Sequence, residues 1–365
     1  MSCKYCYVDH SNIKTMSIKT ARKAVDLASS IMPKGDSAGI IFFGGEPLLH
    51  KDIIYETIEY AKWKEKHEEG LFHYKVTTNG LLLDDDFLEY SKKNNVFIAL
   101  SHDGIKESHD KYRRDVLGNG TFDIINDKAK KLIAARPYAP VLMTINPDTA
   151  CFYADSVKYL YNLGFRYIIC SLNYAAKWED NDMLRLQKQY EILSKFYYEM
   201  TMAEEKFYLS PFEVKISSHI NQKNYCHERC ELGKRQLSVA PDGLLYPCVQ
   251  FVGDDAYSIG DVNTGINEVR RETLYRQNEK EKDTCMECAI KARCNHYCGC
   301  LNKQATGSIN QVSPVLCANE RMLIPIVDKL ANHLFKKRSA IFIQKQYNDY
   351  FPIVSMIEDI TKKNR

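Results

Sequence analysis

Short apolar runs alternate with longer segments of helical periodicity over the first 214 residues of the chain. The short runs predict strands, at residues 39–43, 74–77, 96–101, 141–145, 167–172 and, less regularly, 207–214. The longer segments predict helices, at residues 17–31, 51–66, 84–93, 122–135, 156–163 and 181–204. Ser17 is the predicted N-cap of the first helix, and the run from Gly39 to Phe43 has the character of a buried strand.

Alternation of strands and helices at this spacing is typical of a parallel sheet or barrel with crossover helices. Six helices precede Pro211, but only five of the apolar runs before it are strongly marked. The chain opens in the loop that should follow a first strand. We therefore expect that this strand precedes Met1 and that the printed sequence begins inside a longer one.

The pattern changes after about Lys215, where short segments, turns and cysteines replace the long alternation. Asp242-Gly243 predicts a hairpin between residues 236–240 and 244–246. The charged run at residues 270–282 predicts a solvated helix or linker. Residues 320–363 are again helical in pattern, with one apolar face, made of Ile324, Val327, Leu330, Leu334 and Phe335.

Composition narrows the class of protein. The chain has 365 residues, 45% hydrophobic and 27% charged, which suits one barrel-sized domain with a smaller appendage. Its net charge of +3 suggests no nucleic-acid partner, and no apolar run approaches the length of a membrane span. The N-terminus lacks the apolar stretch of a signal peptide, so we expect a cytoplasmic protein.

The cysteines carry the strongest chemical signal. Disulfides are rare in the cytoplasm, so thirteen patterned cysteines indicate metal binding. One module reads C-x12-G-x4-C, and a second reads C-x2-C-x5-C-x3-C with one further cysteine downstream. With Cys226 they supply eight thiolates, from Cys226, Cys230, Cys248, Cys285, Cys288, Cys294, Cys298 and Cys317. Eight thiolates suit two zinc ions or two iron–sulfur clusters, while Cys170 and Cys300 lie outside the pattern.

Polar and glycine-rich segments follow three consecutive predicted strands. They read Gly44-Gly45-Glu46-Pro47, Thr78-Asn79-Gly80 and Ser101-His102-Asp103-Gly104. The carboxyl ends of parallel barrel strands form one mouth, where such folds place their active sites. A carboxylate and backbone groups there could hold an ammonium group.

These motifs together resemble the radical S-adenosylmethionine (SAM) enzymes that carry a C-terminal SPASM domain. Cys3-Lys4-Tyr5-Cys6 is similar to the second half of the superfamily signature C-x3-C-x2-C. Gly44 to Pro47 is similar to the motif that binds the methionine amino group. Residues 101–122 resemble the S-x-D-G, H-D-x-x-R and G-x-G-[ST]-F run of the peptide-modifying branch, and the cysteine modules resemble the seven-cysteine SPASM pattern.

The resemblance implies an α/β fold with a (β/α)6 radical SAM barrel at residues 1–215, whose first strand is truncated here. It implies a SPASM domain at residues 216–320 and C-terminal helices at 321–365. The implied cofactors are SAM, one radical-generating [4Fe-4S] cluster and two auxiliary [4Fe-4S] clusters. The implied electron donor is of the flavodoxin or ferredoxin type.

By the same resemblance, Cys3 and Cys6 bind the radical-generating cluster. Glu46 with the Gly44-Gly45 backbone holds the SAM amino group, Ser101 and Arg113 meet its carboxylate or ribose, and Asn79 is a weaker ribose candidate. Without the resemblance, Arg113 reads equally well as a solvated charge at a helix end.

The resemblance also implies how the SPASM cysteines are shared. The first auxiliary cluster takes Cys230, Cys248, Cys298 and the less certain Cys226. The second cluster takes Cys285, Cys288, Cys294 and Cys317.

The signature departs from the family at its start. Its first cysteine should stand four residues before Cys3, which lies before Met1. Two thiolates remain for a cluster that needs three. We therefore expect the printed chain to hold this cluster poorly and to be inactive until extended upstream.

The resemblance implies hydrogen abstraction by a 5′-deoxyadenosyl radical from a ribosomal precursor peptide, which is then crosslinked or otherwise oxidised. A formylglycine-forming sulfatase maturase is the alternative. In those enzymes an Asp follows the G-x4-C cysteine, whereas Val249 stands here. A catalytically incompetent iron–sulfur protein is a second alternative.

Overall fold

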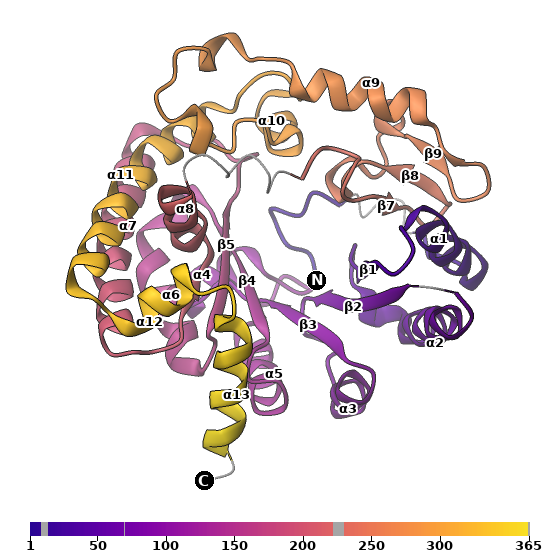
Figure 1. Cartoon of the computed structure of the whole chain (residues 1–365), viewed down its shortest axis with the longest axis horizontal. Coiled ribbons are helices and arrows are strands. Elements are labelled where there is room, and N and C mark those ends of the chain that lie inside the picture. Colours follow the sequence, from indigo (N-terminus) through magenta and orange to yellow (C-terminus); the bar gives the residue numbers. More distant parts are fainter. Residues whose placement is uncertain (9–13, 69, 222–229, 364–365) are drawn as a thin grey trace.

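A parallel sheet surrounded by helices forms the larger part of the molecule (Figure 1). The computed structural model of the chain describes residues 1–8, 14–68, 70–221 and 230–363. Six strands lie in sequence order and each pairs in parallel with the next. They are β1 (Ser37–Phe42), β2 (Leu71–Thr78), β3 (Val96–Ser101), β4 (Pro140–Ile145), β5 (Tyr167–Leu172) and β6 (Tyr208–Leu209).

The six predicted helices, one before β1 and five between the strands, are confirmed to within a few residues. They are α1 (Ile18–Ile31), α2 (Lys51–His67), α3 (Asp85–Lys93), α5 (Phe122–Ala135), α6 (Tyr153–Leu163) and α7 (Asp180–Met202). Ser17 caps α1 as predicted, because its hydroxyl accepts a hydrogen bond from the Thr20 N–H at 3.0 Å. Short helices not predicted from the sequence extend the loops, namely η1 (Pro47–His50), α4 (Lys106–Tyr112), η2 (Pro147–Phe152) and α8 (Ser210–Ile220).

Two predictions about strands need correction. The strand predicted at residues 207–214 stops at Leu209, because Pro211 stands in the first turn of α8, where a missing N–H breaks no helical bond. The run at residues 39–43 is a strand but not a buried one. Ile41 is 58% exposed, because β1 lies at the edge of the sheet and pairs only with β2 among the described strands.

The cysteine-rich segment forms a second, smaller body, drawn in orange above the sheet in Figure 1. Its four short antiparallel strands are β7 (Ser238–Val239), β8 (Leu244–Tyr246), β9 (Gly260–Asp261) and β10 (Gly265–Ile266). The hairpin predicted at Asp242-Gly243 joins β7 to β8, and Gly243 has the positive φ of +95° that the turn requires.

Helices and turns complete this smaller body. The charged run forms α9 (Glu268–Glu279), and α10 (Gly299–Thr306) follows the last cysteine module. Single 3-10 turns lie between them and before them, namely η4 (Val249–Phe251), η5 (Asp255–Tyr257), η6 (Asp283–Cys285) and η7 (Lys291–Arg293).

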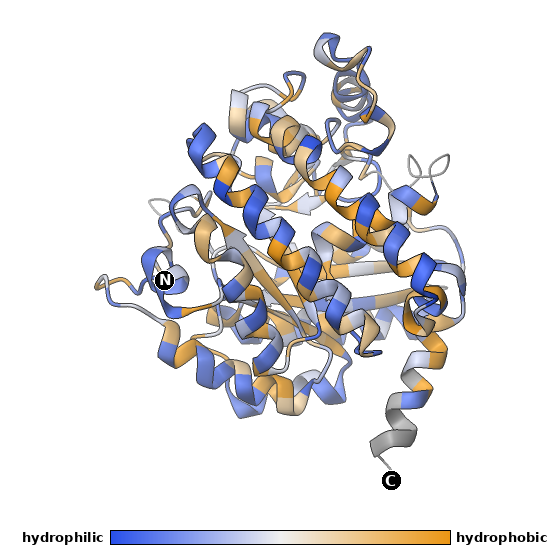
Figure 2. Cartoon of the chain, turned by 90° about the vertical axis from the view of Figure 1, so that its left-hand side faces the viewer, coloured by the Kyte–Doolittle hydropathy of each residue, from blue (hydrophilic) through white to orange (hydrophobic). Residues whose placement is uncertain are grey.

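The C-terminal helices return to the barrel. They are α11 (Pro314–Lys337), α12 (Ala340–Tyr347) and α13 (Phe351–Lys363), and α11 packs along α7 and α8. Its predicted apolar face is confirmed except for Phe335, which is 41% exposed. In Figure 2 the helices alternate blue and orange along their length, while the strands behind them are mostly orange.

The predicted division into three domains stays a prediction. Its first boundary, after residue 215, falls inside α8, and its second, after residue 320, falls inside α11. The apolar cores are nevertheless separate: a large cluster fills the barrel and reaches α11 and α12, and a small cluster surrounds Cys248.

Candidate functional site: a barrel mouth facing a cysteine-rich body

The segment that carries the first two cysteines is held against the loop after α4. The Ser2 N–H donates to the Arg114 carbonyl at 2.8 Å, and the Lys4 N–H donates to the Tyr112 carbonyl at 3.1 Å. The Cys6 N–H donates to the Cys3 carbonyl at 3.0 Å, which closes a turn between the two thiols. Both thiols are free and half-buried.

A buried ion pair anchors this turn to the ends of two strands. The Tyr5 hydroxyl lies 2.5 Å from Asp103 Oδ2, and Arg113 Nε lies 3.1 Å from the same oxygen. The other carboxylate oxygen accepts the Thr144 N–H at 3.0 Å, so Asp103 joins the ends of β3 and β4. The Arg113 guanidinium carbon stands 5.6 Å from the centre of the Tyr5 ring, a cation–π distance.

Arg113 is therefore not a solvated charge at a helix end, although it is the C-cap residue of α4. It is 7% exposed, and Asp103 is 3% exposed. Burial works against the charged guanidinium, but the adjacent Asp103 carboxylate more than compensates and raises the pKa of Arg113. For the Cys3 thiol, by contrast, burial raises the pKa, and the nearby Arg113 charge opposes that change.

Glu46 is held by the neighbouring strand end. Its carboxylate accepts hydrogen bonds from the Thr78 hydroxyl at 2.7 Å, the Asn79 N–H at 2.7 Å and the Leu48 N–H at 3.1 Å. Burial raises the pKa of Glu46, while these three donors and the Met1 ammonium group lower it. Glu46 is thus bound at the carboxyl end of β2, and Asp103 follows the neighbouring strand β3, so the two groups of predicted residues lie at the same edge of the sheet.

The backbone before Glu46 is open. Gly44 and Gly45 are exposed, and a Cβ atom added to either would meet nothing within 4 Å. Two exposed, unobstructed peptide units beside a fixed carboxylate fit the amino end of an amino-acid ligand. Asn79 uses its side-chain oxygen to accept the Leu81 N–H at 3.0 Å, and Ser101 ends β3 two residues before Asp103.

Two buried histidines of these motifs, to which the sequence analysis gave no role, bind the turn after β3. His109 Nδ1 accepts the Asp103 N–H at 3.3 Å, and His102 Nδ1 accepts the Gly104 N–H at 3.1 Å. His109 Nε2 lies 3.1 Å from the Thr121 hydroxyl. The spacing of His102 and His109 around the Asp-Gly turn was the available signal, but only the fold shows that both rings bind backbone groups of the turn.

The first set of SPASM cysteines gathers around the small apolar cluster. Cys248 is buried, and Cys298 Sγ lies 3.4 Å from Cys300 Sγ. Burial first, then the nearby Cys298 and Cys248, raises the pKa of Cys230 to about 12. Cys300, which lies outside the cysteine pattern, packs against this cluster beside Cys298. Cys226 lies outside the described residues.

Two cysteines of the second set contact Arg321. Arg321 Nε lies 3.4 Å from Cys317 Sγ, and its Nη2 lies 3.9 Å from Cys288 Sγ. The Cys288 N–H donates to the Cys285 carbonyl at 3.2 Å, and Cys285 and Cys294 are buried. Burial, together with the Glu320 carboxylate, raises the pKa of Cys294 to about 12. Within the described residues, no three His, Cys, Asp or Glu side chains converge closely enough to hold one metal ion.

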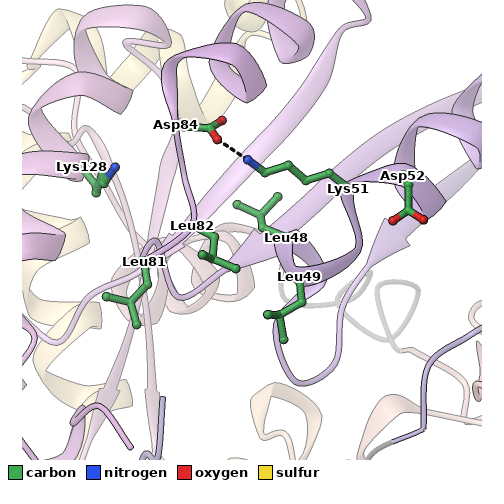
Figure 3. A pocket seen from close by; sticks show the side chains of 8 residues that line it. All are labelled: Leu48, Leu49, Lys51, Asp52, Leu81, Leu82, Asp84 and Lys128. Atoms are coloured by element: carbon green, nitrogen blue, oxygen red, sulfur yellow. Dashed lines mark hydrogen bonds and ion pairs between the residues drawn. The ribbon is translucent and has the colours of Figure 1, made fainter.

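A cavity of about 600 Å³ opens beside the mouth, between the loops that follow β1 and β2. Figure 3 shows Leu48 and Leu49 facing Leu81 and Leu82, with an ion pair of Lys51 and Asp84 along one side. In the part of the chain that the structure describes, no helix combines the length and apolar character needed to cross a membrane.

Comparisons with known families agree with this arrangement. The model of the radical SAM superfamily matches residues 1–150, and the SPASM model, an iron-sulfur cluster-binding domain, matches residues 230–295. The chain belongs to the radical SAM superfamily and carries a SPASM domain. These two domains imply SAM and [4Fe-4S] clusters as cofactors.

Relatives and solved structures extend the match to most of the chain. A cysteine-type anaerobic sulfatase-maturating enzyme of Clostridium novyi is 26% identical over 81% of this chain and 82% of its own. The structure of native anSMEcpe with bound AdoMet and Kp18Cys peptide has a TM-score of 0.76 at 19% identity, covering 91% and 96% of the two chains. Streptococcus suis SuiB bound to precursor peptide SuiA gives 0.59 at 14% identity, covering 86% and 72%. The chain is thus a radical SAM SPASM enzyme related to sulfatase maturases and peptide modifiers.

Proposed function

We propose that this protein is a peptide maturase that abstracts hydrogen from a ribosomal precursor peptide and oxidatively crosslinks or otherwise modifies it. The observation that carries the proposal is the shared mouth, where the Cys3-Cys6 turn, the fixed Glu46 and the open Gly44-Gly45 backbone lie under a cysteine-rich body. When bound, SAM and its cluster supply a 5′-deoxyadenosyl radical that takes the hydrogen atom.

The chain's own residues bind and orient these groups. Cys3 and Cys6 are the proposed thiolate ligands of the radical-generating cluster. Glu46 would accept the SAM ammonium group with the carboxylate that Thr78 and Asn79 already hold in place. Because this carboxylate needs no reorganisation, its attraction for a cation is greater than that of a mobile side chain.

Other mouth residues have positions compatible with the remaining SAM groups. We assign Ser101 and Arg113 to the carboxylate or ribose of SAM, and Asn79 to the ribose. Arg113 Nε is already bound to Asp103, so its Nη groups are the donors that would serve the ligand. The Asp103 contact would orient them.

We assign the SPASM cysteines to two auxiliary clusters, which would accept an electron from the substrate radical. Cys230, Cys248, Cys298 and Cys226 form the first set. The second set is Cys285, Cys288, Cys294 and Cys317. An electron donor of the flavodoxin or ferredoxin type would reduce the radical-generating cluster. The boundaries at residues 215 and 320 remain our proposed domain limits.

Formylglycine formation is the second candidate, favoured by the likeness to sulfatase-maturating enzymes. Val249 disfavours it, because a valine directly after Cys248 cannot serve as the base expected at this position. A peptide substrate is common to both candidates, and the structures named above contain peptides bound to the similar proteins.

The experiment is anaerobic reconstitution with iron and sulfide, followed by reduction in the presence of SAM. A protein extended upstream to carry a cysteine four positions before Cys3 should bind about twelve irons, in three four-iron clusters, and should cleave SAM to 5′-deoxyadenosine.

Glu46→Gln in that extended protein should reduce SAM cleavage at least tenfold, with Glu89→Gln, an exposed carboxylate on α3, as the control. Two zinc ions in place of iron would contradict the proposal. Formylglycine on a sulfatase peptide, without modification of the peptide encoded beside this gene, would favour the second candidate.

A further inference from the structure

One carboxylate oxygen connects the cysteine turn, residues 3–6, to the arginine of the barrel mouth. Asp103 Oδ2 accepts the Tyr5 hydroxyl at 2.5 Å and Arg113 Nε at 3.1 Å. The side chains of Asp103 and Arg113 are both buried, so water screens these contacts only weakly. A change in one contact therefore affects the other.

The carboxylate between these two donors has a fixed position. Asp103 Oδ1 accepts the Thr144 N–H from the end of β4 at 3.0 Å, and the Asp103 N–H donates to His109 Nδ1 at 3.3 Å. Asp103 is thus bound to the barrel through its side chain and through its backbone. It can therefore set the positions of the groups that bind its other oxygen.

Tyr5 makes its contact from within the cysteine turn. The Lys4 N–H donates to the Tyr112 carbonyl at 3.1 Å, and the centres of the Tyr5 and Tyr112 rings lie 5.6 Å apart. These contacts hold the backbone and the ring of this segment. The Tyr5 hydroxyl adds a direct link from the turn to Asp103.

Arg113 makes the second contact and carries a charge. Its guanidinium carbon stands 5.6 Å from the centre of the Tyr5 ring, so the ring limits where the guanidinium can lie. Nε is bound to Asp103, and we propose that the Nη groups serve the SAM carboxylate or ribose. Without the Tyr5 hydroxyl, Asp103 Oδ2 would have one donor fewer and would draw the guanidinium closer to itself. The Nη groups would then be less well placed for SAM.

We infer that Tyr5 is a positioning residue: its hydroxyl, through Asp103, sets the Arg113 guanidinium for SAM and holds the cysteine turn to the ends of β3 and β4. The inference rests on the proposed function and gives Tyr5 no part in the reaction itself. Because coupling between two sites is reciprocal, SAM bound at Arg113 also stabilises the cysteine turn.

Tyr5→Phe tests the inference, because it removes the hydroxyl and keeps the ring. In the reconstituted protein extended upstream, it should weaken SAM binding about tenfold, as expected for the loss of one hydrogen bond to a charged group. Equilibrium dialysis measures the affinity. The change that SAM causes in the electron paramagnetic resonance spectrum of the reduced cluster should need about tenfold more SAM. The rate of SAM cleavage at saturating SAM should stay close to that of the parent.

A second measurement needs neither iron nor SAM. In the iron-free chain, Tyr5→Phe should speed the hydrogen exchange of the Lys4 and Cys6 amides, whose hydrogen bonds hold the turn. Nuclear magnetic resonance follows the two amides, and circular dichroism checks that the variant is folded.

Tyr112→Phe is the matched control, because the Tyr112 hydroxyl bonds to Asp148, an exposed carboxylate. It should keep the SAM affinity, the spectrum and the amide exchange of the parent. Parent-like SAM affinity or parent-like amide exchange in Tyr5→Phe would overturn the inference, as would equal losses in both variants. A lower rate at saturating SAM with unchanged affinity would also overturn it. A parent protein that binds no SAM contradicts the proposed function instead, which separates the two failures.

Discussion

At the scale of single residues, the motif side chains form hydrogen bonds and ion pairs with one another or with neighbouring strand ends. Asp103 binds Tyr5, Arg113 and the Thr144 N–H, and Glu46 binds groups from the next strand end. The sequence predicted Glu46 and Asp103 at the carboxyl ends of parallel strands, and in the structure they follow β1 and β3. It could not show their pairing, because hydrogen-bond partners depend on which loops the barrel brings together.

Asp103→Asn should lower the free energy of unfolding by roughly 3–5 kcal/mol, because it leaves the buried Arg113 charge without its counter-ion. Urea unfolding measures the effect. Asp127→Asn is the control: its pair with Lys130 is largely exposed, and the loss should not exceed about 1 kcal/mol. Equal losses of unfolding free energy in the two variants would show that the buried pair stabilises the protein no more than the exposed pair.

The two buried histidines predict a dependence of stability on pH. Burial, with Arg113 as a smaller cause, lowers the pKa of His102 to about 3. Burial and the neighbouring His102 lower the pKa of His109 as well. An unfolded histidine has a pKa of about 6.5, so below that pH the unfolded chain takes up protons that the folded chain does not.

Stability should therefore be fully present above pH 6.5 and fall as the pH decreases towards 5.5. Each histidine contributes a limiting slope of roughly 1.4 kcal/mol per pH unit. Urea unfolding at several pH values should show the slope, and His109→Asn should remove about half of it. His73→Gln, at an exposed position, should leave it unchanged. If the stability of the parent chain did not change between pH 6.5 and pH 5.5, the low pKa values of His102 and His109 would be contradicted.

At the scale of elements, hydrophobic periodicity predicted the barrel helices and most strands, because these segments bury one face against a continuous core. Periodicity failed where the position of a segment in the fold determines its burial or its secondary structure. The apolar composition of β1 did not reveal its place at the sheet edge, and Pro211 turned an apolar run into the start of α8. The short α4 and α10 lack the length over which periodicity can be recognised.

A second buried ion pair joins three elements at the boundary between barrel and cysteine-rich body. Lys215 on α8 lies 2.6 Å from Glu320 on α11, and both side chains are 3% exposed. Lys215 Nζ also donates to the Arg293 carbonyl at 2.9 Å, one residue before Cys294. This contact links the loop that carries Cys294, a proposed cluster ligand, to the barrel.

Lys215→Met should destabilise the protein by roughly 3–5 kcal/mol, since it leaves the Glu320 carboxylate buried without a partner. Lys215→Met combined with Glu320→Leu should recover much of that loss, because it removes both charges. A double-mutant cycle in urea measures the coupling. Additive effects of the two substitutions would show that the residues act independently.

At the scale of the whole molecule, the chain has two separate apolar cores of unequal size. The barrel core extends through α7, α8 and α11, whereas the second core has six buried members, Cys248 among them. A body with so few buried apolar side chains depends on other bonds for its stability. Its cysteines supply them if metal is bound.

Removal of iron should therefore unfold the cysteine-rich body while the barrel remains folded. Metal binding contributes directly to the folding free energy of small metal-containing domains, and the four strands at residues 238–266 are only two or three residues long.

In limited proteolysis, iron-free protein should be cut first between residues 230 and 312, and iron-loaded protein should resist cleavage there. The barrel fragment should keep its circular dichroism spectrum, because its core includes no proposed cluster ligand. Equal protection of this segment with and without iron would mean that the short strands and α9 fold without the clusters.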